Sequence, residues 1–330
     1  MARGPRESAA WFWEALARKF PLKGWNYVDI GQPQTYCGLC IAKRLEAGVA
    51  WYSVDQTGPI QEFLEEHGMA VVRPVPTPMV QDDRLHEDAP MVSKKEHKWV
   101  RTTVGSLSYF AVHTRYDVAY EVNRIAQYLE RPTANTVTAV KRVMAYLATR
   151  AEQIMLDVPR VWGTQWETFT DSDLAGEGHR SRTGVITMVN GMVSAWRSNK
   201  QPVTSTSSAV AEIYALSEGC KDVQFINWRA EELGVTVKYP AVIRCDNQAA
   251  VTFQHGTCVS SRIRGLVDLR EPWIKELRDG KKISAVHVPT GENVADMLTK
   301  YLNRTSREKL MEIVRSKAKA VAGSFRGHDR

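Results

Sequence analysis

The sequence lacks the long apolar segments that would place it across a membrane. No apolar run approaches the roughly 20 residues that a spanning helix requires, and residues 1–20 lack the continuous apolar core of a signal peptide. Cysteine is scarce and odd in number, with five residues in a chain of 330. Such a set is typical of reduced thiols and not of a disulfide scaffold. We therefore expect an intracellular protein, cytoplasmic or nuclear, without a membrane partner.

Sulfur and imidazole metal ligands are also sparse. Cys37 and Cys40 have the spacing of a zinc or redox pair, but no second Cys/His pair is placed to complete a zinc site. The surrounding segment is predicted to be a strand, so an ordinary structural role is the favoured interpretation.

The size and charge of the chain are those of a folded protein with a mild basic excess. Its 330 residues suffice for two domains of ~150 residues. The net charge is +7, and residues 301–330 supply +5 of it, with eight Lys or Arg against three Asp or Glu. This distribution favours a polyanionic partner, although such an excess also occurs without one. The basic end is either a phosphate-binding surface or a solvated helix with a frayed end.

Changes in composition and periodicity divide the chain into five segments. Residues 1–80 alternate short helices and strands, and residues 81–98 are rich in proline and charge, which predicts a linker. Residues 99–160 have apolar residues at helical spacing and predict a small helical unit. Residues 161–315 are predicted to form an α/β domain, and residues 316–330 a basic, disordered tail.

The predicted α/β domain begins with three strands, two of them joined across Asn190-Gly191, the strongest short hairpin signal. A long helical region from Ser207 to Leu233 follows, with a break expected near Cys220. Two further strands then alternate with helices. This order predicts a mixed sheet flanked by helices.

Four acidic residues stand where packing alone would not place an acid. Asp171 and Asp246 each end a predicted strand, and the carboxyl ends of strands in an α/β sheet face the crevice where ligands bind. Glu212 lies in a helix among small apolar residues, and Asp296 follows the last strand. Converging carboxylates repel one another unless cations lie between them, and oxygen ligands select Mg²⁺ or Mn²⁺. Each acid alone is more readily explained as a turn or surface residue, but the four together favour a metal site.

Five segments, in this order, carry a resemblance to a known family: TDSDLAG, SRTGVITMVNG, SAWRSNKQPVTSTSSAVAEIYALSEG, CDNQAAV and VHVPTGENVADMLTK. They resemble the successive motifs of the ribonuclease H domain in the Pol polyprotein of copia-type LTR retrotransposons, over about residues 165–313. Residues 104–147 resemble the connection region that precedes this domain. The segment FLEEHGMAVVRPVPTPM resembles the end of the reverse transcriptase, so residues 1–80 are expected to be its post-palm remnant.

The resemblance implies a ribonuclease H-like fold with a five-stranded mixed sheet, and an endonuclease that hydrolyses the RNA strand of RNA–DNA hybrids. It places Asp171, Glu212, Asp246 and Asp296 on the family's catalytic, metal-binding acids, with two Mg²⁺ or Mn²⁺ ions as cofactors. The implied partners are an RNA–DNA hybrid and other parts of a Pol polyprotein. No small-molecule substrate is expected.

The resemblance also implies contacts with the hybrid at Arg197, Ser198, Lys200, Gln201 and Asn247. For the hairpin edge that carries the first four, a solvated edge without a ligand is an equal alternative.

His287 lies nine residues before Asp296, where nucleases of this fold often carry a mobile histidine that assists metal or product exchange. An ordinary histidine at a strand end is the favoured interpretation.

Several positions depart from the family pattern. Val210 replaces an acid that usually precedes the catalytic glutamate, Leu174 replaces an aromatic residue, and residues 265–268 replace a Lys-His-Ile-Asp motif that bears on hybrid binding. The Tyr-x-Asp-Asp hairpin of the polymerase is missing, since Ile30 follows Tyr27-Val28-Asp29. Two alternatives to an active ribonuclease H therefore remain: a catalytically silent nucleic-acid-binding fragment, or part of an RNA-directed DNA polymerase whose palm lies outside this chain.

Overall fold

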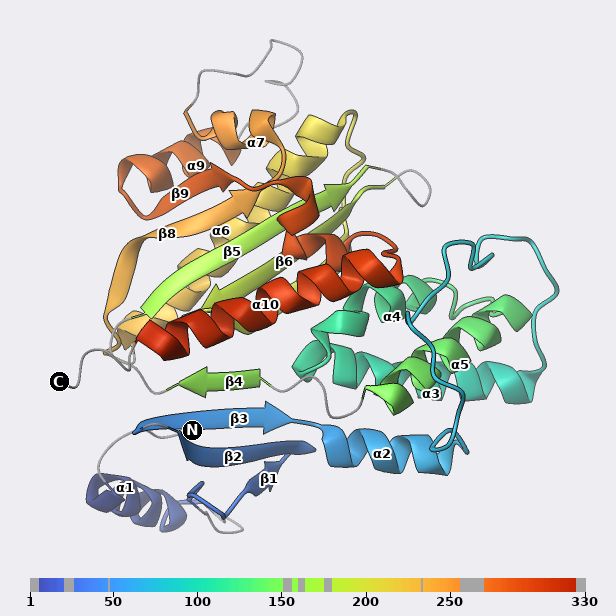
Figure 1. The fold of residues 1–330 in the computed structure, drawn as a ribbon, viewed down its shortest axis with the longest axis horizontal. Helices are drawn as coiled ribbons and strands as arrows, with labels where there is room; N and C mark the ends of the chain where they lie inside the picture. Colours follow the sequence, from blue (N-terminus) through green and yellow to red (C-terminus); the bar gives the residue numbers. More distant parts are fainter. Residues whose placement is uncertain are drawn as a thin grey trace.

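The computed structural model describes residues 6–20, 27–46, 48–150, 156–159, 164–174, 180–232, 234–255 and 270–324. Two β-sheets and one helical unit make up this part of the chain (Figure 1). No helix among these residues has the length and apolar character to cross a lipid bilayer. Residues 265–268, where the Lys-His-Ile-Asp motif is replaced, lie outside the described residues.

The first sheet joins the N-terminal segment to the strand that precedes the α/β domain. Its strands are β1 (Gln34–Tyr36), β2 (Leu39–Glu46), β3 (Val49–Asp55) and β4 (Leu156–Pro159), and α1 (Arg6–Ala17) comes before them. All neighbours in the order β1-β2-β3-β4 are antiparallel. Residues 156–159, predicted to belong to the helical unit, are therefore a strand, because they pair with β3 from a hundred residues away in sequence.

The helical unit contains α2 (Thr57–Glu66), α3 (Lys94–His113), η1 (Tyr116–Val118), α4 (Ala119–Ala126) and α5 (Ala134–Thr149). Ser93 caps the start of α3 with a capping box, in which the Ser93 side chain accepts from the Glu96 N–H and the Glu96 side chain accepts from the Ser93 N–H. Phe63 of α2 packs in the same buried cluster as the apolar residues of α3, α4 and α5, so α2 belongs to this unit.

The segment predicted as a linker, residues 81–98, is packed onto the helical unit. Leu85 is 2% exposed, and Arg124 of α4 donates to both carboxylate oxygens of Asp83. Lys94 already begins α3. Proline and charge predicted an extended linker, but one buried leucine and one forked ion pair hold the segment in place.

The second sheet has five strands in the order β7-β6-β5-β8-β9. These are β5 (Thr164–Asp173), β6 (Arg182–Val189), β7 (Met192–Lys200), β8 (Val237–Cys245) and β9 (Ile283–His287). Strands β5, β6 and β7 are antiparallel neighbours, whereas β8 runs parallel to both β5 and β9. Asn190 and Gly191 both have positive φ in the β6–β7 turn, as this type of tight hairpin requires.

Helices cover both faces of this sheet. On one face lie α6 (Ser208–Glu232), α7 (Gln248–Phe253) and α9 (Arg270–Asp279); on the other lie η2 (Thr290–Glu292), η3 (Val294–Leu298) and α10 (Arg304–Ser324). Figure 1 shows α10 crossing the near side of the sheet, with α6 behind it. The predicted mixed five-stranded sheet flanked by helices is confirmed.

Two predicted features of this domain are corrected. Helix α6 has no break near Cys220, because Cys220 is fully buried against the sheet and the helix continues to Glu232. The tail predicted from residue 316 begins inside α10, which extends to Ser324. Its apolar residues Leu310 and Met311 are buried on the sheet, and Lys317 pairs with Glu167 of β5 at 2.7 Å.

A buried ion cluster fixes the helical unit on the α10 face of the sheet. The Arg307 guanidinium of α10 donates to the Glu121 carboxylate of α4 and to the Asp117 carbonyl of η1. Arg115 pairs with both carboxylate oxygens of Asp117 at 2.9 Å. These four side chains are at most 1% exposed, so each charge depends on its partner and not on water.

Replacing Arg307 by methionine should leave the Glu121 carboxylate buried without its cation. We expect a loss of about 3–5 kcal/mol in the free energy of unfolding, the usual cost of removing one partner from a buried pair. Urea denaturation measures this loss. The double replacement Glu121→Met/Arg307→Met removes both charges and should recover most of it. A double variant as unstable as Arg307→Met would contradict the assignment of the loss to an uncompensated charge.

Candidate metal centre

Four carboxylates from four separate elements meet at the carboxyl ends of β5 and β8 in the five-stranded sheet. Asp171 lies near the end of β5, and Asp246 directly follows β8, the parallel neighbour of β5. Glu212 projects from the first turns of α6, and Asp296 lies in η3. The structure thus brings together all four acids singled out in the sequence.

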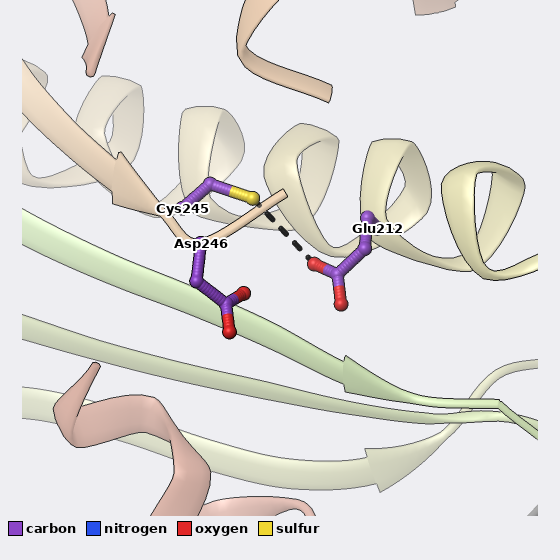
Figure 2. A group of neighbouring side chains, drawn as sticks. All are labelled: Glu212, Cys245 and Asp246. Carbon is purple, nitrogen blue, oxygen red and sulfur yellow. Dashed lines mark hydrogen bonds between the residues drawn. The ribbon is translucent and has the colours of Figure 1, made fainter. Parts of the chain in front are cut away.

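Two overlapping groups of ligand atoms result. Oxygens of Asp171, Asp246 and Asp296 lie within 4.8 Å of one another, and so do ligand atoms of Glu212, Cys245 and Asp246. Figure 2 shows Glu212 and Asp246 projecting toward each other from α6 and from the end of β8, with Cys245 beside them. Asp246 belongs to both groups, so the two candidate ligand groups adjoin.

Two glycines permit the close approach of the elements that carry these acids. Gly184 of β6 is the register partner of Asp171. A Cβ at Gly184 would lie 2.7 Å from Thr299 Cγ2 and 2.8 Å from the Ala295 carbonyl oxygen, so only glycine lets η3 and its Asp296 lie this close to the sheet. A Cβ at Gly219 of α6 would lie 2.6 Å from Thr170 Cγ2, beside Asp171 on β5.

Hydrogen bonds orient the acids. The Thr299 hydroxyl donates to Asp171 Oδ2. The Ser172 N–H donates to Glu212 Oε1 at 3.1 Å, and the Cys245 thiol lies 3.5 Å from Glu212 Oε2. Lys300 Nζ lies 3.1 Å from Asp296 Oδ2 and 3.6 Å from Asp171 Oδ2.

The protonation of the cluster reflects burial and mutual repulsion. Burial raises the pKa of Glu212 to about 8, and the Asp171 carboxylate acts in the same direction. Burial and Asp171 likewise raise the pKa of Asp296 to about 8, against the opposing charge of Lys300. The pKa of Asp171 is also raised by burial, although Lys300 and Thr299 oppose this shift. For Lys300, the two carboxylates outweigh burial and raise the pKa above its usual range.

The residues present fit a pair of hard divalent ions. Most of the donors are carboxylate oxygens, which suit Mg²⁺ and Mn²⁺ better than softer metals. Asp296 Oδ1 is buried and has no hydrogen-bond partner among the described residues. A bound cation would satisfy this oxygen, whose isolation is otherwise costly.

The side chains predicted to contact a hybrid are largely engaged within the protein. Arg197 of β7 pairs with Glu218 and Asp222 of α6. Ser198 is buried and accepts from Arg182 at 3.2 Å.

Gln201 and Asn247 have structural roles as well. The buried Gln201 side chain donates to Thr183 Oγ1 and to the Ala211 carbonyl, both at 3.0 Å, and so ties β6 to α6. Asn247 caps α7 by accepting from the N–H groups of Ala249 and Ala250. Lys200 of β7 is partly exposed, and burial lowers its pKa, as do the nearby Arg182, Arg124 and Arg180. Most of the side chains on the hairpin edge therefore have partners within the protein, and Lys200 is partly exposed.

His287 is exposed at the end of β9, where its register partner is Cys245, the residue before Asp246. Neither metal-ligand group among the described residues includes its side chain, so the auxiliary role implied by the resemblance stays a prediction. Cys37 and Cys40 belong to the first sheet and its turn, and no described metal-ligand group includes them.

Sequence reasoning missed Thr299, Lys300 and Cys245 as members of the site. The signal for the first two was their place three and four residues after Asp296 in ADMLTK, where a short helical turn returns the chain to the acids. Cys245 is the last residue of β8, and in the sequence it has the pattern of an ordinary buried strand residue.

Comparison with known proteins finds relatives across most of the chain. No protein-family model matches. The retrovirus-related Pol polyprotein from transposon TNT 1-94 of Nicotiana tabacum is 28% identical over 309 residues, covering 91% of this chain and 22% of its own length. That from transposon RE2 of Arabidopsis thaliana is 31% identical over 298 residues, covering 89% of this chain and 19% of its own length. The chain therefore spans about a fifth of the length of these relatives.

Solved structures of similar shape include LC11-RNase H1 in complex with an RNA/DNA hybrid. It is 19% identical, with a TM-score of 0.33, and covers 41% of this chain and 94% of its own. The N-terminal RNase H domain of rv2228c from Mycobacterium tuberculosis is 17% identical with a TM-score of 0.32, covering 49% of this chain and 98% of its own.

Alanine at Gly184 should disturb the cluster without removing a ligand. Its Cβ would force η3 away from β6, at a cost of about 1–3 kcal/mol in the free energy of unfolding. We expect Mn²⁺ affinity to fall by at least about tenfold, because the orientation of metal ligands is sensitive to such shifts. Calorimetric titration with Mn²⁺ measures it. Gly105→Ala, where a Cβ meets nothing within 4 Å, is the control; an equal loss of affinity in both variants would refute this role of Gly184.

The raised pKa values make metal affinity depend on pH. Protons compete with the metal at Glu212 and Asp296 below about pH 8, so affinity should rise by about tenfold per pH unit for each proton displaced. Without metal, the folded protein binds more protons than the unfolded chain between about pH 4.5 and 8, so the free energy of unfolding should fall as pH rises through that range. Calorimetric titration with Mn²⁺ at pH 6, 7 and 8 measures the affinity, and repeating it in a second buffer reports the protons released. An affinity that does not change with pH, without proton release, would contradict the raised pKa values of Glu212 and Asp296.

Proposed function

This chain is a homologue of the Pol polyproteins of copia-type transposons over most of its length, and we propose that its carboxylate cluster is the active site of a ribonuclease H that cuts the RNA strand of RNA–DNA hybrids. The observation that carries the proposal is the convergence of Asp171, Glu212, Asp246 and Asp296 in two groups that share Asp246. A retrotransposon context supplies such hybrids, and the other parts of a Pol polyprotein are the proposed partners.

The proposed mechanism assigns each acid by its place in the two groups. Asp171, Asp246 and Asp296 would hold one divalent ion, and Glu212 with Asp246 the other. When bound, such a pair of ions activates water and stabilises the leaving oxygen in phosphodiester hydrolysis.

The surrounding residues keep this site in shape. Thr299 and the Ser172 N–H hold the Asp171 and Glu212 carboxylates in fixed orientations. Asp171, Glu212 and Asp296 are buried, and without a bound ion Lys300 offsets part of the charge of the cluster. No cysteine or serine nucleophile is required.

The catalytically silent alternative is less well supported. A fragment that only binds nucleic acid has no need for the two glycines that bring Asp296 and Glu212 close to β5. The packed surroundings of the four acids therefore favour an active nuclease.

Asp171→Asn, Glu212→Gln and Asp246→Asn should each reduce Mg²⁺-dependent cleavage of a hybrid by at least about a hundredfold, because each removes a charge that the ions need. Cleavage is followed with a labelled RNA strand, and circular dichroism checks the fold. Glu218→Gln removes a carboxylate from the same helix as Glu212, outside the two groups, and should cleave at nearly the wild-type rate. Near-wild-type cleavage by one of the three variants would remove that residue from the site.

A further inference from the structure

Lys300 places an ammonium group among the acids of the proposed site. It follows η3, four residues after Asp296, and its Nζ lies 3.1 Å from Asp296 Oδ2 and 3.6 Å from Asp171 Oδ2. These two carboxylates are 8% and 3% exposed, whereas the Lys300 side chain is 36% exposed. The charged end is therefore inserted into the cluster while part of the stem remains in solvent.

The position of Lys300 coincides with one of the two ligand groups. Asp171 and Asp296 are two of the three acids whose oxygens lie within 4.8 Å of one another. A lysine ammonium is a compact charge with three donors on a flexible stem, so it can neutralise a pair of carboxylates and can also leave them. Two cations cannot both lie close to the same pair without strong repulsion.

We propose that Lys300 is a built-in cation that competes with the divalent metal for Asp171 and Asp296, and so sets the metal concentration at which the site loads. The inference rests on the proposed function, because it takes the cluster to be a metal site. Before a metal ion binds, Lys300 stabilises the two carboxylates, and the incoming ion then displaces its ammonium group.

Other features of the site agree with displacement. Lys300 contacts Asp296 through Oδ2 and leaves the buried Oδ1 without a partner among the described residues. Thr299 already donates to the same Asp171 oxygen that Lys300 approaches. Asp171 therefore keeps an internal partner when the ammonium moves away, and Asp296 has an oxygen ready for an incoming ion.

A purely structural ion pair makes different predictions from a competing cation. A structural pair stabilises the protein equally with and without metal, and its removal leaves metal affinity unchanged or weakened. A competing cation stabilises mainly the protein without metal, and its removal strengthens metal binding. Metal affinity and the metal dependence of stability therefore separate the two roles.

The test compares Lys300→Gln with the wild type in the absence of nucleic acid. Mn²⁺ binding is measured by electron paramagnetic resonance of the free ion. The melting temperature of each protein is then measured twice, in EDTA and in saturating Mn²⁺. We expect Lys300→Gln to bind Mn²⁺ about tenfold more tightly. Its melting temperature should be lower than that of the wild type in EDTA, and the difference should shrink in saturating Mn²⁺.

Lys317→Gln is the matched control. It removes another partly exposed lysine that pairs with a carboxylate on the same sheet, Glu167 at 2.7 Å, outside the metal-ligand groups. Its Mn²⁺ affinity should equal that of the wild type. If Lys300→Gln fails to fold, the acylation of Lys300 in the wild type, followed by mass spectrometry, gives the same test, since Mg²⁺ should expose the amine and increase its labelling.

Equal or weaker Mn²⁺ binding by Lys300→Gln, or labelling of Lys300 that Mg²⁺ does not increase, would overturn the proposal. Asp171→Asn distinguishes this from a failure of the proposed function. If the wild type binds Mn²⁺ and Asp171→Asn does not, the metal site stands and only the role of Lys300 is lost. If the two bind alike, the metal site itself is refuted.

Discussion

The repulsion among four converging carboxylates, three of them buried, is the constraint on which the rest of the site depends. Asp171, Glu212 and Asp296 are buried, so water screens their charges poorly, and the half-buried Asp246 belongs to both ligand groups. Protonation, the ammonium of Lys300 and divalent ions are three ways to relieve the repulsion, and the first two are visible in the raised pKa values and the ion pairs. A protein that needed only stability would replace such acids by neutral residues.

Close backbone packing is what holds the acids together against this repulsion. Gly184 admits η3 to the sheet beside Asp171, and Gly219 admits α6. Farther from the site, Arg307 and Glu121 join α10 to the helical unit, and α10 follows directly on the segment that carries Asp296 and Lys300. The contact between the helical unit and α10 therefore adjoins the packing that positions Asp296.

The sequence was sufficient to predict the mixed sheet and to single out the four acids, because strand ends and helical periodicity are local properties. It was not sufficient for features that depend on distant segments. The pairing of β4 with β3 and the insertion of Arg307 between α4 and η1 join residues separated by a hundred positions or more. Composition misled the prediction of a tail from residue 316: the basic segment continues helix α10, whose apolar residues Leu310, Met311 and Val314 pack on the sheet just before it. The role of Lys300 was equally hidden, because only the fold brings it to Asp171.

The central claim is that this cluster hydrolyses the RNA strand of a hybrid. The most direct measurement presents one sequence as RNA–DNA hybrid, duplex DNA and single-stranded RNA to the same protein in Mg²⁺. Recognition of 2′-hydroxyl groups and of the groove shape distinguishes these substrates, whereas phosphate contacts do not. We predict cleavage of the RNA strand in the hybrid, with little cleavage of the other two. Equal rates on all three, or a preference for duplex DNA, would contradict the account and point to another nuclease of the same fold.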